Sequence, residues 1–77
     1  MIYEIWRYWK GDDVLVGHVD TLAGAVLSAR ATQAAWPDDD IRIEWSEQVG
    51  DICHDYCVHL LDEGSLKLIW ENEDGET

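Results

Sequence analysis

The stretch that decides the fold is Ile2-Tyr3-Glu4-Ile5-Trp6-Arg7-Tyr8-Trp9. In an extended chain, successive side chains point to opposite faces, so the six apolar residues of this stretch divide between two faces. Because both faces are apolar, we expect a strand in the middle of a sheet rather than at its edge. One face would hold Ile2, Trp6 and Tyr8, and the other would hold Tyr3, Ile5 and Trp9.

The residues that follow predict a hairpin and then a helix. Lys10–Asp13 has the composition of a turn, and Val14–Val19 that of a returning strand. Asp20 or Thr21 can cap a helix that ends near Ala35, shortly before the only proline of the chain. Four residues recur at the spacing of one helical face: Leu22, Ala25, Val26 and Ala29. A second set of small residues favours a helix lying close on a sheet: Gly24, Ala25, Ser28 and Ala29.

The second half of the chain begins with the clearest alternating strand. Apolar and polar residues alternate strictly over Ile41–Ser46, and a polar link is expected over Glu47–Asp51. Ile52–Leu61 fits two structures: a helix with its apolar residues on one face, or a strand from about Tyr56. The strand is favoured, because residues typical of a hairpin turn follow it, and the helix remains the alternative.

A last hairpin completes the predicted order ββαβββ. Asp62–Ser65 suits a turn and Leu66–Trp70 suits the final strand. A right-handed strand-helix-strand crossover then places the third strand antiparallel beside the first. The expected fold is α+β: a five-stranded antiparallel sheet of order 2-1-3-4-5 with one helix packed on one face. It forms a single domain over residues 1–71, followed by a frayed acidic tail over residues 72–77.

The chain is strongly acidic. Seventeen Asp and Glu against five Lys and Arg give a formal charge of -12, while 47% hydrophobic residues favour a packed core over disorder. Such an excess repels nucleic acid and anionic membranes, so we expect neither as a direct partner and expect basic protein surfaces instead. The sequence has no apolar run near the ~20 residues of a membrane span, and its start lacks a basic signal region, which predicts a cytoplasmic protein.

The predicted topology brings three acid clusters to one end of the sheet. The first hairpin turn, the entry to the third strand and the last turn all emerge there. We call these seven residues the acidic rim: Asp12, Asp13, Asp38, Asp39, Asp40, Asp62 and Glu63. The sheet face opposite the helix is expected to be uncovered, with Trp6 and Tyr8 on it. The rim and these two aromatics are the candidate partner-binding residues.

The remaining chemical groups do not form a recognisable site. Cys53 and Cys57 are about 13 Å apart on a strand, too far for one zinc ion or a disulfide, and we expect two free thiols. Asp38–Asp40 lacks the alternating ligands of a calcium loop. His18 and His59 have no evident nucleophile or oxyanion donor beside them. No catalytic residues, metal or cofactor are therefore expected.

Small size, strong acidity, a sheet with one helix and no catalytic motif together resemble phage-encoded anti-CRISPR and antirestriction proteins that mimic DNA. The resemblance implies a non-enzymatic inhibitor that binds the basic nucleic-acid-binding surface of a CRISPR or restriction complex and blocks DNA binding. On this hypothesis the acidic rim presents the charges. The alternative is a small interaction or assembly module that binds through the exposed Trp/Tyr face, with a homodimer as one form.

Overall fold

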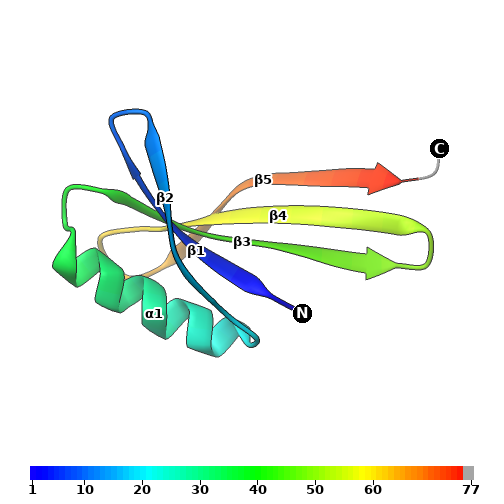
Figure 1. Cartoon of the computed structure of the whole chain (residues 1–77), viewed down its shortest axis with the longest axis horizontal. Helices are drawn as coiled ribbons and strands as arrows, with labels where there is room; N and C mark the ends of the chain where they lie inside the picture. The colour runs from blue at the N-terminus through cyan, green and yellow to red at the C-terminus, as the bar shows by residue number, and fades with distance from the viewer. Residues whose placement is uncertain (76–77) are drawn as a thin grey trace.

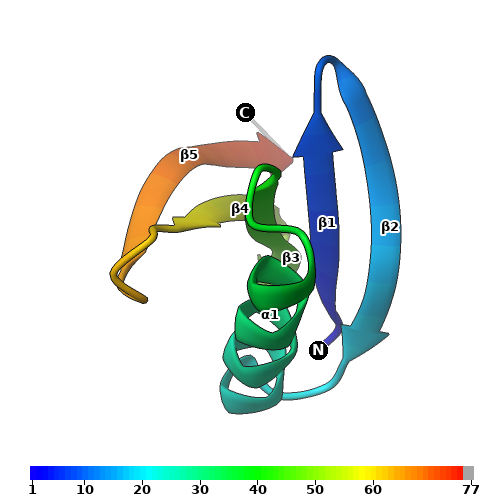
Figure 2. The same cartoon turned by 90° about the vertical axis from the view of Figure 1, so that its left-hand side faces the viewer.

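The computed structural model describes the backbone of residues 1–75 and the side chains of residues 1–69. Over this range five strands form one antiparallel sheet of order β2-β1-β3-β4-β5, and α1 packs against β1, β2 and β3 on one face (Figure 1, Figure 2). The predicted α+β fold, element order and strand order are confirmed. The elements are β1 (Tyr3–Trp9), β2 (Asp12–Val19), α1 (Leu22–Ala35), β3 (Asp40–Val49), β4 (Ile52–Leu60) and β5 (Leu66–Gly75).

The β1–β2 hairpin closes with a two-residue turn. Lys10 and Gly11 both have positive φ, 49° and 88°, which matches the right-handed twist of the strands. β2 therefore begins at Asp12, two residues before the predicted strand. A register shift beside Ile5 and Trp6 marks a bulge in this pairing. β1 lies between β2 and β3, as its two apolar faces predict.

Helix α1 begins and ends close to the predicted positions. The side chain of Thr21 accepts a hydrogen bond from the backbone N–H of Gly24 at 3.1 Å, so Thr21 is the N-cap. The helix ends at Ala35, and Trp36 donates its backbone N–H to Thr32 before Pro37 prevents continuation.

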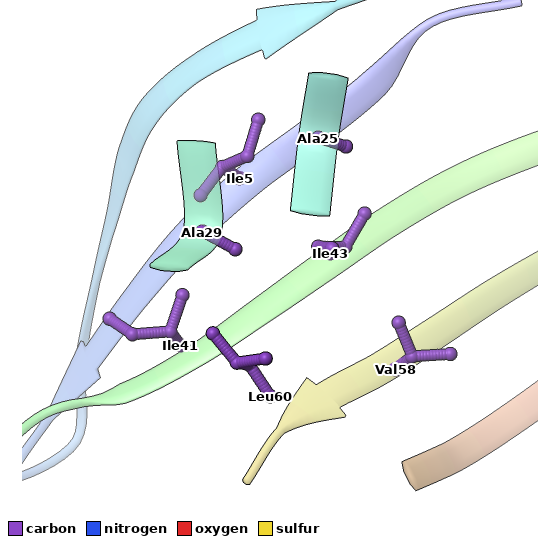
Figure 3. Close-up of a cluster of buried hydrophobic side chains, with 7 residues drawn as sticks. All are labelled: Ile5, Ala25, Ala29, Ile41, Ile43, Val58 and Leu60. Atoms are coloured by element: carbon purple, nitrogen blue, oxygen red, sulfur yellow. The ribbon is translucent and has the colours of Figure 1, made fainter. Parts of the chain in front are cut away.

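The core lies between α1 and the centre of the sheet. Ala25 and Ala29 have no exposed surface and allow the helix to approach the strands closely. Their side chains face the apolar residues of β1, β3 and β4 (Figure 3). This one layer of contacts holds the helix to the sheet through seven buried residues: Ile5, Ala25, Ala29, Ile41, Ile43, Val58 and Leu60.

The β3–β4 hairpin is longer than predicted. The expected polar link over Glu47–Asp51 is wrong, because β3 continues to Val49 and only Gly50 and Asp51 form the turn. The backbone of residues 47–49 pairs with that of residues 52–54, and this cross-strand hydrogen bonding stabilises an extended conformation that the polar residues do not favour alone. β4 spans Ile52–Leu60, so the predicted strand is confirmed but begins four residues before Tyr56, and the helical alternative is excluded.

Strand β5 is also longer than predicted. It runs to Gly75 rather than Trp70, and its backbone pairs with the extra length of β4 as far as Ile52. Residues 72–75 of the expected frayed tail therefore belong to the sheet. The last two residues of that predicted tail, 76–77, lie outside the described residues.

Candidate acidic binding surface

The acidic rim lies at the end of the sheet where β1 ends and β3 begins (Figure 1). Five of its seven carboxylates line one open depression of about 500 Å³, together with Gln33, His59 and the start of the last turn. Asp12 and Asp13 are exposed on the β1–β2 hairpin and do not line it. The five that share the depression are Asp38, Asp39, Asp40, Asp62 and Glu63.

Two of these carboxylates already face cations of the same chain. Arg7 donates from Nε to Asp39 Oδ2 at 2.7 Å, and the Asp39 side chain is only 8% exposed. The Arg7 guanidinium also lies 3.8 Å from the centre of the Trp36 ring. Asp40 is 3.6 Å from His59 Nε2 and 3.9 Å from Arg42 Nη2. Asp39 thus joins β1 to the loop after α1 and is not available to a partner.

The last turn keeps its two acids at the surface. Gly64 adopts a φ of 89° and donates its N–H to the Leu61 carbonyl at 2.8 Å, while Leu61 donates to Ser65. Arg30 of α1 donates to the Gly64 carbonyl at 3.2 Å and ties the turn to the helix. Asp62 and Glu63 are exposed, as is Asp38.

Trp6 and Tyr8 lie on the sheet face away from α1, as predicted, but both are half-buried. The Tyr8 hydroxyl donates to Glu44 Oε2 at 2.6 Å, and the Arg42 guanidinium lies 4.3 Å from the centre of the Tyr8 ring. Burial and the bond to Glu44 raise the pKa of Tyr8 above its ordinary value. Tyr8 is therefore held in a polar network on this face.

The same network covers one of the two free thiols. Cys57 is 1% exposed, and burial, followed by the charge of Glu44, raises the pKa of its thiol to about 11. Cys53 is half-buried, and its Sγ lies 3.9 Å from Asp55 Oδ1. Among the described side chains, no group of three or more His, Cys, Asp or Glu could hold a metal ion.

Charge is distributed unevenly, which the sequence reading missed. All five Lys and Arg lie at the rim end. Arg7 and Arg42 lie beside rim acids, and Lys10 is in the first turn. Arg30 of α1 contacts the last turn, and Lys67 of β5 pairs with His59 of β4. The other end is the arm, defined as residues 45–56 of β3 and β4 with residues 71–75 of β5 paired to them. The signal was present in the sequence, because no Lys or Arg stands between Arg42 and Lys67 or after Lys67.

Comparison with protein-family models, with curated proteins and with solved structures found no match. In the described part of the chain, no helix is long and apolar enough to cross a membrane.

Proposed function

We propose that this chain is a non-enzymatic inhibitor that occupies the basic nucleic-acid-binding surface of another protein and blocks DNA binding. The resemblance to anti-CRISPR and antirestriction proteins makes a CRISPR or restriction complex in the cytoplasm the expected partner. A charge of -12 on 77 residues supports a basic partner. Opposite charges accelerate the encounter of two proteins, and like charges suppress binding to acidic partners.

One observation carries the proposal: the division of charge along the molecule. Asp38, Asp62 and Glu63 are exposed at the rim end, and the arm adds Glu47, Asp51 and Asp55 without a Lys or Arg in its sequence. Carboxylates near both ends of a molecule 40 Å in its longest dimension can contact Lys and Arg along a basic groove. Duplex DNA offers the same groove a row of phosphates.

Competition with DNA tests the proposal directly. A purified CRISPR effector or restriction complex is loaded with fluorescently labelled target duplex, and this chain is titrated while anisotropy reports release. We expect release, with an apparent affinity that falls at least ~10-fold between about 50 and 200 mM salt, because charge pairs replace counterions.

A charge-preserving control separates electrostatics from folding. One variant converts six acids to their amides, and the control exchanges Asp and Glu at the same positions. The amide variant should lose most of the competition and the control should keep it. A complex that holds DNA and this chain together without mutual loss contradicts the proposal. The six positions are Glu47, Asp51, Asp55, Asp38, Asp62 and Glu63.

The second candidate function is association through the Trp6 and Tyr8 face. Leu15 and Val16 are each 44% exposed on β2, and Leu15 pairs with Trp6. Trp6 Nε1 is enclosed without a hydrogen-bond partner among the described residues. Binding by this apolar patch should hold or strengthen as salt rises, the reverse of the charge mechanism. A dimer in light scattering that is lost in Trp6→Ala would favour this candidate.

A further inference from the structure

The arm extends beyond the part of the sheet that α1 covers. Figure 1 shows the β3–β4 hairpin and β5 continuing to one side, past the end of the helix. The buried core stops at Ile43 and Val58, whereas β3 runs on to Val49 and β4 starts at Ile52. The helix-side face of the arm is therefore a sheet surface that no described helix covers.

Aromatic rings form a row where the core ends and continue onto this face. Tyr3, Trp45 and Tyr56 occupy one cross-strand row, with ring centres 5.3 Å and then 5.2 Å apart, and the second pair is stacked. His54 stacks on Tyr56 at 6.2 Å. All four rings are half-buried, so each keeps accessible surface. Val49 at the tip is 59% exposed on the same face.

The surroundings of these rings are acidic. Glu47 is the cross-strand partner of His54 and so lies on the same face as the rings. Asp51 is in the turn of the hairpin, and Asp55 lies on the opposite face of the sheet. Among the described residues, no Lys or Arg lies on the ring face of the arm, so the charge beside the rings is negative and favours a cationic ligand.

We propose that the helix-side face of the arm binds arginine side chains of a basic partner, whose guanidinium groups pack on the accessible parts of the Trp45, Tyr56 and His54 rings. The partner class rests on the proposed function. Arginine is favoured over lysine because its planar guanidinium stacks on rings, is more weakly hydrated than an ammonium and pairs with carboxylates through two hydrogen bonds.

The chain itself uses this pairing at the rim end. Arg7 lies 3.8 Å from the Trp36 ring centre and Arg42 lies 4.3 Å from that of Tyr8, both closer than Lys10 to Trp9 at 5.0 Å. A second copy of this chain is the wrong occupant for the arm, because two acidic arms placed face to face would repel each other.

Two peptides of equal charge test the proposal: octa-arginine and octa-lysine, each titrated into the intact chain by calorimetry and NMR. We expect octa-arginine to bind at least ~5-fold more tightly, because stacking adds to charge. The indole signal of Trp45 should shift with octa-arginine and less with octa-lysine. Trp45 itself is not replaced, since it packs against the core.

Two variants of equal charge locate the site. Glu47→Gln removes one charge from the ring face of the arm, and Asp55→Asn removes one from the opposite face of the same arm. Glu47→Gln should weaken octa-arginine binding by ~3-fold or more, and Asp55→Asn by less, because the charge closer to the ligand is screened least.

Equal affinity for the two peptides, equal weakening by the two variants, or self-association through the arm would each overturn this proposal. The outcome is separable from the proposed function. Arginine-selective binding at the arm without DNA competition would leave this inference standing and refute the proposed inhibitor. Competition with DNA but no preference for octa-arginine would support the proposed inhibitor and refute arginine binding at the arm.

Discussion

Cys57 is a free thiol with only 1% of its surface exposed. Its distance from Cys53 along a strand predicts a free thiol, and both thiols are free. The sequence gives no sign that Cys57 is shielded on the face away from the helix, where Arg42, Glu44 and Tyr8 surround it. Burial and then Glu44 oppose the thiolate, and together they outweigh Arg42, which favours it.

The raised pKa of Cys57 predicts a loss of stability in alkali. The pKa of the thiol is raised from its ordinary value of 9.0 to about 11 in the folded chain. As pH rises through this window the unfolded chain releases its proton first, so the contribution of Cys57 to folding declines. Urea unfolding of the protein and of Cys57→Ala should give free energies whose difference narrows from pH 8 to about pH 11. A constant difference would contradict the assignment.

Asp39 is the residue where composition misled most. Its place in Asp38–Asp40 makes it one of the predicted partner-binding residues, yet its carboxylate pairs with Arg7 and is largely enclosed. The two residues are 32 positions apart in the sequence. Only the antiparallel pairing of β1 with β3 brings them together.

At the scale of elements, the β3–β4 hairpin depends on a tight turn. Gly50 adopts a φ of 63°, in the left-handed region that residues with a Cβ atom adopt at a cost. Gly17, beside the bulge in β2, does not adopt a positive φ, and a Cβ at either glycine would meet no atom within 4 Å. Conformation alone therefore distinguishes the two positions.

We expect Gly50→Ala to lower the free energy of unfolding by about 1–2 kcal/mol. Gly17→Ala should be neutral or stabilise by up to ~1 kcal/mol, because it restricts only the unfolded chain. Urea unfolding of both variants is the measurement. Equal changes in the free energy of unfolding for the two variants would show that the positive φ of Gly50 is not needed for the turn.

For the whole molecule, the dominant property is the net charge of -12. Repulsion among the acids opposes the compact state, and the few ion pairs at the rim end offset only part of it. The arm, with no Lys or Arg, should feel the repulsion most. Stability should consequently depend on ionic strength.

Raising NaCl from about 20 to 200 mM at pH 7 should increase the free energy of unfolding by on the order of 1 kcal/mol, because the Debye length shrinks. Urea is the suitable denaturant, since it is uncharged. Near pH 4.2, the isoelectric point of the sequence, the same change of salt should have little effect. A protein destabilised by salt at pH 7 would indicate that its ion pairs outweigh its repulsion.

The sequence by itself determined the order of elements, the strand order and the total charge. Two apolar faces place Ile2–Trp9 inside the sheet, the crossover rule orders the strands, and charge is a sum over residues. Tertiary structure alone decided where strands end and which charges are paired. The residues 47–49 are extended because β4 pairs with them. The charge of Asp39 is paired because Arg7 of β1 lies beside it. Arg7 and Asp39 are 32 positions apart in the sequence, and residues 47–49 are held by backbone hydrogen bonds to residues 52–54, so the alternation of side chains along the chain reveals neither effect.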